Sequence, residues 1–342
     1  RMLADPARYY KGGKPDLQLF DKKLYEVNPD DKVAIARAAA EEVLGKDERI
    51  ISVDSSYSDG EGSSYRLISN GFEGESKSTW FSVSASVSIK GEGEARPQDY
   101  WYDSALFYDK LTKAGIGAKA LERVLRKLGQ KKAKSGKYTM VVDPMNVGNL
   151  LSPMLSALYG SALQQKNSFL MDKLDTKVAS DLFTLRDEPH AIGANGSRYF
   201  DNEGVATEPR TVFDKGVLKT YFIDTYNGKK MDIAPTISAP SRLILTPGDK
   251  DLNGLVADIK QGILVTGFNG GNSNSSTGDF SYGIEGFLIE DGKLTQPVNE
   301  MNVTGNMVTL WNSLVAVGND PQPNRSWQIP SLVFEGVDFS GL

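Results

Sequence analysis

The feature that most constrains the fold is a strict alternation of apolar and small polar residues between positions 80 and 90, WFSVSASVSIK. Successive side chains of a β-strand point to opposite faces, so this pattern predicts a strand with one buried face. Residues 50–57 and 63–70 alternate in a similar way, and the segments SDGEG and NGFEGES that follow them favour turns. We therefore expect a three-stranded antiparallel meander with this apolar face: Phe81, Val83, Ala85, Val87 and Ile89.

A second constraint comes from residues 138–170, which predict a strand followed by a buried helix. Residues 138–142 form an apolar run typical of a strand. Asp143 and Pro144 suit the start of a helix, because an acidic residue caps free N–H groups and proline has no N–H to leave unpaired. Apolar residues then recur at helical spacing, which predicts a wide buried stripe: Leu150, Leu151, Met154, Leu155, Leu158 and Tyr159.

Two properties of this helix remain open from its pattern. Pro153 either kinks it or begins a new helix with Ser152 as N-cap. The middle of the helix contains no His, Glu, Asp or Cys. On pattern alone it is therefore a core element without chemistry.

The remaining patterns predict a chain of the α+β class, with antiparallel sheets and packed helices. After an irregular lead-in over residues 1–24, Asn28 caps a helix over residues 30–45, and a second helix ends at Gly129. Residues 131–137 form a polar linker, which divides the chain into an N-terminal α/β domain, residues 1–130, and a C-terminal α+β domain, residues 131–342. The other predicted strands are residues 181–185, 210–212, 217–223, 242–246, 263–267, 284–289 and 329–334, and the other predicted helices are residues 251–259 and 308–315.

Composition excludes several classes of function. The 39 Lys and Arg residues and 44 Asp and Glu residues give a net charge of −5 and are interspersed, so no basic face for nucleic acid is predicted. No apolar run reaches the length of a membrane span, so no membrane association is expected. Cysteine is absent, which excludes disulfides and a cysteine nucleophile and fits a reducing compartment such as the cytoplasm.

His190 is the one histidine of the chain, so no multi-histidine metal site can be built. It lies in the segment DEPHAIG, and no G-x-S-x-G motif accompanies it. We interpret His190 as a structural or surface residue rather than a member of a catalytic triad.

Residues 267–283 are rich in Gly, Asn and Ser and lack both a P-loop and a dinucleotide fingerprint. Two interpretations stay open: a long hairpin loop with a bulge, or a loop that borders a cleft. The residues that would line such a cleft are Asn269, Gly270, Gly271, Asn272, Thr277 and Asp279.

Three blocks of the sequence, in the same order, resemble the TldD/PmbA family. They are YGSALQQKNSFL with the later DNEGVATEPRTVFDKGVLKTYFIDTYNGKKM, then TGDFSYGIEGFLIEDGKLTQPV, then NEMNVTGNMVTLWNSLVAVGND. The resemblance begins near residue 16 and continues to the end of the chain. It implies the fold of that family, and it implies that the N-terminal part of the family fold is missing from this sequence.

The resemblance also bears on metal chemistry. TldD-like members are zinc metallopeptidases with an H-E-x-x-x-H motif and a later Cys, whereas PmbA-like (TldE-like) members lack that motif. On the motif, Met154 stands at the first His, Leu155 at the Glu and Tyr159 at the second His, and residues 324–328 replace the Cys region. Apolar side chains cannot hold Zn²⁺, so the chain resembles the PmbA branch, and no metal or catalytic residue is expected in it.

The resemblance therefore implies a non-catalytic subunit that pairs with a TldD-like zinc protease and acts on extended or unfolded peptides. Zinc is expected only in that partner. Residues 50–90 and 267–283 would be the walls of the peptide cleft, with an exposed strand edge as the binding element. The family label "modulator of DNA gyrase" has no counterpart in the charge pattern.

Two alternatives stay open. The first is a stand-alone peptide-binding or scaffold protein. The second is a homodimeric hydrolase that uses His190 or the paired carboxylates Asp187 and Glu188.

Overall fold

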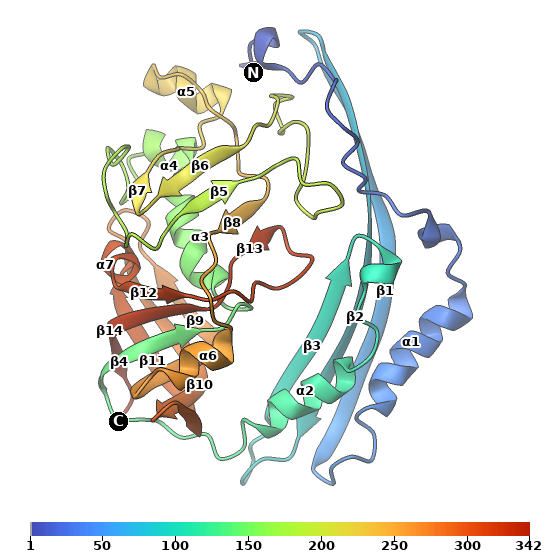
Figure 1. Ribbon diagram of the computed structural model, residues 1–342, viewed down its shortest axis with the longest axis vertical. Coiled ribbons are helices and arrows are strands. Elements are labelled where there is room, and N and C mark those ends of the chain that lie inside the picture. The colour runs from blue at the N-terminus through green and yellow to red at the C-terminus, as the bar shows by residue number, and fades with distance from the viewer. Residues whose placement is uncertain (1) are drawn as a thin grey trace.

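The computed structural model describes residues 2–342 and has two parts, which Figure 1 shows side by side. One part is a tall three-stranded sheet, in the order β1-β2-β3, with helices on one face. The other contains a six-stranded sheet and a five-stranded sheet, so the fold is mixed α and β, as the sequence predicts. No helix among residues 2–342 is long and apolar enough to cross a membrane.

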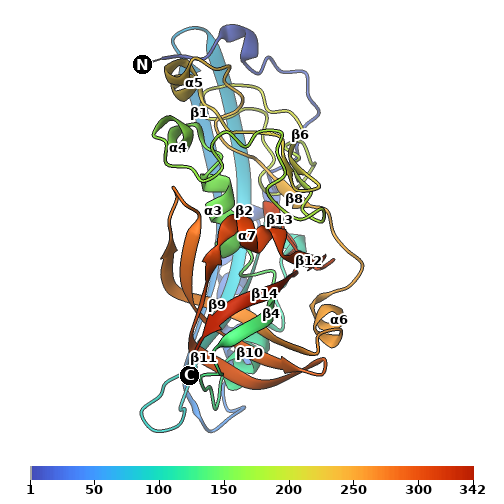
Figure 2. The same ribbon diagram turned by 90° about the vertical axis from the view of Figure 1, so that its left-hand side faces the viewer.

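The three-stranded part is built on a hairpin of two unusually long strands. β1 (Ile50–Ile68) and β2 (Phe72–Ile89) pair antiparallel along their whole length, and β3 (Gln98–Ala105) pairs only with residues 81–88 of β2. Figure 2 shows this hairpin behind the C-terminal part, extending over nearly the full height of the molecule. The helical elements of this part are η1 (Pro6–Arg8), η2 (Lys22–Tyr25), α1 (Pro29–Glu41), η3 (Tyr108–Lys110) and α2 (Ile116–Leu125).

The predicted apolar face of β2 is confirmed, since its five apolar residues from Phe81 to Ile89 are all buried in one cluster with α1 and α2. The predicted turn at SDGEG is wrong, because β1 runs straight through it. Gly60 pairs with Trp80 across the ladder, and a Cβ on Gly60 would lie 3.1 Å from the Trp80 ring. Glycine here makes room for the indole. The one turn of the hairpin is at Gly71, whose φ of +105° suits glycine.

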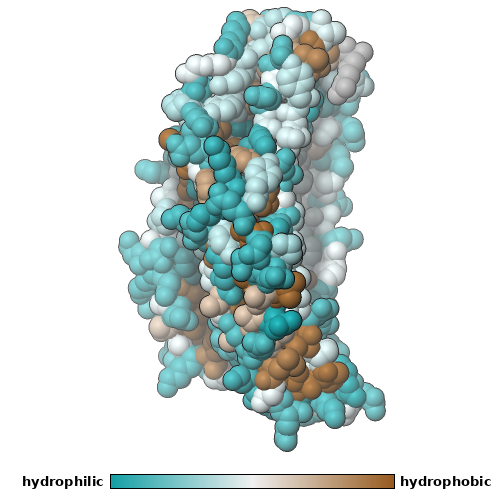
Figure 3. Space-filling model, turned by 90° about the vertical axis from the view of Figure 1, so that its right-hand side faces the viewer, coloured by the Kyte–Doolittle hydropathy of each residue, from teal (hydrophilic) through white to brown (hydrophobic). Residues whose placement is uncertain are grey.

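Helix α1 begins as predicted, with the Asn28 side chain accepting a hydrogen bond from Asp31 N. The apolar residues of this helix and its C-terminal end are buried only in part. Val43, just after the helix, is buried, but Val33 and Leu44 are 55% and 57% exposed. The helix packs on β1 through small residues such as Ala39, which keeps it close to the sheet. The face of the molecule on the α1 side is largely hydrophilic, with small hydrophobic patches (Figure 3).

In the C-terminal part, the six-stranded sheet has the order β11-β10-β9-β4-β14-β12, and only β4 and β9 run parallel in it. Its strands are β4 (Gly136–Val142), β9 (Gln261–Ser273), β10 (Asp279–Glu290), β11 (Lys293–Asn306), β12 (Leu314–Val317) and β14 (Leu332–Ser340). The five-stranded sheet, in the order β13-β8-β5-β6-β7, consists of β5 (Leu185–Asp187), β6 (Arg210–Asp214), β7 (Val217–Leu218), β8 (Leu243–Leu245) and β13 (Trp327–Gln328). The helices are α3 (Gly148–Ser156), α4 (Gly160–Gln164), α5 (Thr225–Met231), α6 (Leu252–Ala257) and α7 (Met307–Asn312).

The buried helix after β4 differs from its predicted form at both ends. It begins at Gly148, because Asp143 instead closes a turn by accepting hydrogen bonds from Asn146 N and Nδ2. It continues through Pro153 to Ser156, so it does not restart at Ser152. The chain breaks at Tyr159, which is extended with φ −74° and ψ 141°, and α4 follows.

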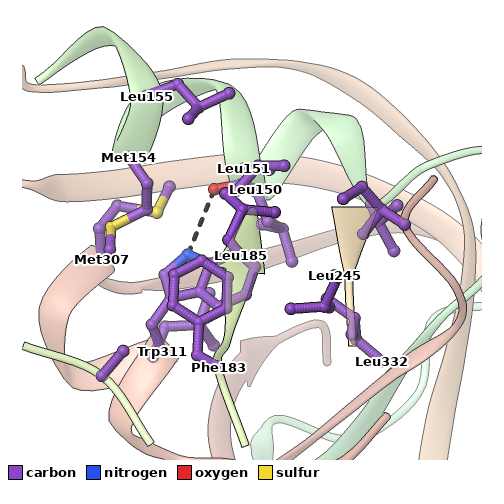
Figure 4. Packing of buried hydrophobic residues seen from close by; sticks show 14 of the residues in the cluster. Leu150, Leu151, Met154, Leu155, Phe183, Leu185, Leu245, Met307, Trp311 and Leu332 are labelled. Atoms are coloured by element: carbon purple, nitrogen blue, oxygen red, sulfur yellow. Dashed lines mark hydrogen bonds between the residues drawn. The ribbon is translucent and has the colours of Figure 1, made fainter. Parts of the chain in front are cut away.

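The predicted stripe of this helix is confirmed as core. Leu150, Met154 and their apolar neighbours pack against Phe183, Met307 and Trp311 from other elements (Figure 4). The Trp311 indole N–H donates to the Leu150 carbonyl oxygen at 3.3 Å, so the packing also satisfies the polar group of the largest core side chain. This helix is therefore held by tertiary contacts on its apolar face.

Of the two interpretations left open for residues 267–283, the hairpin with a bulge agrees with the structure, but its loop is short. β9 and β10 extend into this segment, and only residues 274–278 connect them. The strand expected at residues 181–185 lies at Leu185–Asp187 instead, where it can pair with both β6 and β8.

Core packing of α3 makes a direct prediction. Met154→Ala should lower the free energy of unfolding by about 2–5 kcal/mol, because it removes a fully buried side chain and leaves a cavity. Ser152→Ala, on the exposed side of the same helix, should change it by less than about 0.5 kcal/mol. Urea unfolding monitored by tryptophan fluorescence measures both. Equal stability of the two variants would contradict this packing.

Candidate functional site

The three positions that the resemblance places on the zinc motif do not form a site. Met154 and Leu155 are 0% and 2% exposed and point into the core (Figure 4). Tyr159 is half-buried at the break between α3 and α4, with its ring 5.9 Å from that of Phe222. Burial raises the pKa of the Tyr159 hydroxyl, so it stays neutral at physiological pH.

The exposed side of α3 carries no alternative ligands. It presents Asn149, Ser152 and Ser156. The whole segment from Gly148 to Gln164 contains no His, Asp, Glu or Cys, so this holds in any alignment of the motif.

Across residues 2–342, no three His, Cys, Asp or Glu side chains lie together in a way that could hold a metal ion. The segment expected to replace the family cysteine, residues 324–328, supplies Asn324, Arg325 and Gln328 instead. A cationic guanidinium and neutral amides do not make a zinc site. The residues present therefore do not fit the metal of the family.

One cavity is a groove of about 1550 Å³, here called the hairpin groove. It lies between the far end of the β1–β2 hairpin and two irregular segments. Aromatic pairs form much of its wall: Tyr10 stacks on Tyr199 with ring centroids 5.0 Å apart, and Phe72 meets Phe200 edge-on at 5.0 Å. Its lining comprises Pro6, Ala7, residues 9–12, 16–20, 63–66 and 71–77, Phe107 and residues 197–202.

An open strand edge borders this groove. Because β3 pairs only with residues 81–88 of β2, residues 72–80 of β2 have β1 on one side and no strand on the other. Within residues 2–342, the second edge of this stretch makes one backbone hydrogen bond, from Thr79 N to the Leu19 carbonyl oxygen at 3.0 Å. Unpaired N–H and C=O groups of this kind accept an added extended chain.

The structure does not bring the two expected cleft walls together. The meander contributes residues 63–66 and 71–77 to the hairpin groove, but the β9–β10 hairpin lines none of it. Of the expected cleft residues, Asn269, Gly270, Gly271 and Asn272 are exposed in β9, Thr277 is in the turn, and Asp279 begins β10.

The tip of the β9–β10 hairpin is fastened to its own half of the molecule. The Asn306 amide donates to the Thr277 carbonyl oxygen at 2.8 Å and to Asp279 Oδ1 at 3.0 Å. The hydrogen bonds that the Asp279 carboxylate accepts from the Asn306 amide and the Thr277 hydroxyl lower its pKa. Ser275 Oγ bonds Asn167 at 2.7 Å. The candidate residues here serve local structure.

His190 and the neighbouring carboxylates are likewise engaged in structural contacts. The His190 ring bonds Thr207 Oγ1 at 3.0 Å. Asp187 is buried and accepts from the backbone N–H groups of Ser241 and Arg242 at 3.0 and 2.8 Å. Glu188 binds Arg186 at 2.7 Å. None of the three lines the hairpin groove.

Sequence models of two protein domains match this chain. The "PmbA/TldA metallopeptidase central domain" matches residues 22–128, and the "PmbA/TldA metallopeptidase C-terminal domain" matches residues 135–341. The chain belongs to the PmbA/TldD family. It is a metallopeptidase-like protein whose own described residues provide no metal site.

Relatives within the family are similar over most of this chain. A metalloprotease PmbA homologue of Haemophilus influenzae is 30% identical over 335 residues, which cover 96% of this chain and 73% of the relative. Metalloprotease PmbA of Escherichia coli O157:H7 is 28% identical over 331 residues, 96% of this chain and 73% of its own length.

Solved structures have the same fold. A crystal structure from Bacteroides thetaiotaomicron, named as a candidate modulator of DNA gyrase, is 73% identical, with a TM-score of 0.99 over 100% of this chain and 78% of the other. TldE from Thermococcus kodakarensis is 21% identical, with a TM-score of 0.83 over 100% of this chain and 80% of that one. The second likeness concerns the fold alone.

Sequence reasoning did not find the hairpin groove as a whole. The aromatic doublets Tyr9-Tyr10 and Tyr199-Phe200 are the visible signal, but they are about 190 residues apart and lie in segments without periodicity. The first of these segments is held at the groove from two sides: Asn70 Nδ2 donates to the Ala4 carbonyl oxygen at 2.9 Å, and Tyr10 N donates to the Gly204 carbonyl oxygen at 3.0 Å.

The environment of His190 predicts a dependence on pH. Burial lowers its pKa below the ordinary 6.5, so the folded chain binds this proton more weakly than the unfolded chain. The resulting stability is fully present above the pKa of His190 in the unfolded chain, and it is lost as the pH falls through the pKa of His190 in the folded chain. The decrease in Tm between about pH 7.5 and about pH 5.5 should therefore be smaller in His190→Gln than in the wild type. An identical decrease would show that His190 is not linked to folding.

Proposed function

We propose that this chain is a non-catalytic subunit of a zinc metallopeptidase complex that acts on extended or unfolded peptides. The partner would be a TldD-like chain, which would hold the zinc and supply the catalytic carboxylate. The observation that carries this proposal is the burial of Met154 and Leu155 in a helix without any metal-binding side chain. The absence of cysteine favours a reducing compartment such as the cytoplasm as its location.

The hairpin groove supports a role in handling peptides. Its open strand edge, residues 72–80 of β2, offers backbone groups that pair with any extended chain, whatever its sequence. Its aromatic walls provide apolar contact area with little side-chain entropy to lose. A folded substrate has no free strand to offer, so the groove favours unfolded segments.

Metal content and activity test the proposal. The purified chain should hold no stoichiometric zinc and should not cleave casein, because it has no ligand set. Co-expression with the TldD-like chain of the same genome should give a complex that contains zinc and cleaves casein, and a chelator should abolish this activity. Metal analysis and a fluorescent casein assay measure both. Stoichiometric zinc in this chain alone would overturn the proposal.

Proline substitution tests the strand edge. Successive residues of a strand direct their N–H groups to opposite sides, and Thr79 N points away from β1, so Glu75 N faces the open edge and Ser76 N faces β1. Proline removes the N–H donor. Glu75→Pro should weaken the binding of an unfolded peptide while the hairpin stays folded, and Ser76→Pro should destabilise the hairpin.

Fluorescence anisotropy of a labelled unfolded peptide and thermal unfolding separate the two effects. Unchanged peptide affinity in both variants would show that peptides do not pair with this edge.

A further inference from the structure

A second cavity adjoins the hairpin groove and has a different character. It has a volume of about 470 Å³, and Gln18 and Phe107 line both spaces. We call it the arginine cavity. Its complete lining is Gln18, Leu106, Phe107, Lys110, Ile192, Gly193, Ala194, Asn195, Arg242, Asn324, Arg325 and Gln328.

The charged side chains that line the arginine cavity are all basic, although the Glu188 carboxylate is close enough to Arg242 to act on its pKa. Lys110, Arg242 and Arg325 line it, and no acidic residue does. None of these three cations forms an ion pair among residues 2–342. Lys127, at another contact between the two parts of the molecule, is by contrast paired and lies 2.7 Å from Glu285.

The two guanidinium groups are poorly satisfied. Arg242 Nε is buried without a hydrogen-bond partner in the described part of the chain. Arg325 has one long contact with Gln322, at 3.4 Å, and lies over the Tyr102 ring at 4.7 Å. Burial lowers the pKa of both groups. A partly buried cation without an anion is unfavourable, and a bound anion would relieve this.

Backbone contacts hold the segments that carry Arg242 and Arg325 close together. Parallel pairing of β13 with β8 sets the segment after Arg325 beside Arg242, and Leu243 N donates to the Ser326 carbonyl oxygen at 3.1 Å. Gln328 Nε2 fixes the preceding turn by donating to the Arg325 carbonyl oxygen at 2.7 Å. Gly196 allows a third loop to approach, since a Cβ there would lie 2.7 Å from that of Ser326. Figure 1 shows the β13 loop extending toward β3.

We propose that the arginine cavity binds a carboxylate, and that this carboxylate is the C-terminus of a peptide lying in the hairpin groove. The planar fork of a guanidinium matches a carboxylate, and the side-chain amides of Gln18 and Asn324, which have no hydrogen bond within residues 2–342, add neutral donors. The lining shared with the groove gives the chain end a direct path. The identity of the carboxylate as a peptide end rests on the proposed function, whereas the cationic cavity does not.

Binding of paired peptides to the isolated chain tests this. A labelled, unfolded octapeptide with a free C-terminal carboxylate should bind about tenfold or more tightly than the same peptide with an amidated C-terminus, because charged hydrogen bonds are lost in the amide. Arg242→Gln and Arg325→Gln should each reduce this preference. Arg37→Gln, an exposed arginine in α1 distant from the cavity, should retain it.

A second variant keeps the test sharp if an arginine variant fails to fold. Gln18→Glu changes an exposed lining residue whose side chain has no hydrogen bond within residues 2–342. It introduces a carboxylate into the cavity, and it should abolish the preference for the free acid by pairing with the arginines.

The outcomes separate this proposal from the proposed function. Equal affinity of the wild type for free acid and amide overturns carboxylate capture, and so does competition by inorganic phosphate but not by acetate. If this occurs while the complex with a TldD-like chain still cleaves casein, the arginine cavity is refuted and the subunit role stands. A free-acid preference in a chain that finds no such partner leaves the cavity supported and refutes the subunit role.

Discussion

The arrangement of the molecule depends on a cluster of four charged side chains where its two parts meet. Asp99 of β3 lies 3.2 Å from both Arg123 and Lys127, and Lys127 reaches Glu285 of β10 at 2.7 Å. All four side chains are 5–16% exposed, so removal of one would leave a buried charge uncompensated at a cost of about 3–5 kcal/mol. The arginine cavity is lined by residues of both parts, so a shift of one part against the other would change its shape.

The local sequence around Glu285 is adapted to that contact. The ladder between β9 and β10 shifts register next to Glu285, which redirects the side chain toward α2. Gly267 pairs with Glu285, and a Cβ on Gly267 would lie 2.7 Å from Glu285 Oε1. The glycines of this stretch therefore serve strand geometry. Their density suggested a long loop because glycine marks both loops and bulges, and only the pairing partner distinguishes them.

Where the sequence predicts the structure well, the determining contacts are periodic and local. The serine alternation identifies the buried face of β2, and the spacing of Leu150, Met154 and Leu158 identifies the core side of α3. Prediction fails where a distant residue decides. The glycines around Gly60 predict a turn, and only the pairing of Gly60 with Trp80 shows that the strand continues. The hairpin groove likewise forms only where residues 9–20, 63–77 and 197–202 come together. The lack of a complete zinc ligand set follows from the sequence itself, because one histidine and no cysteine cannot supply two His and one Cys.

Strand addition alone leaves a bound peptide poorly specified. Backbone pairing along residues 72–80 of β2 is equally good after a slip of two residues, since each slip restores the same face and the same ladder. An extended substrate would then occupy many registers, and a partner's catalytic group would meet it at random positions. A carboxylate held by Arg242 and Arg325 at one end of the groove removes this degeneracy, because only one residue of a peptide carries a C-terminal charge. The strand edge and the unpaired cations therefore have complementary roles. The edge supplies affinity without sequence preference, and the cavity sets the direction and register of the peptide.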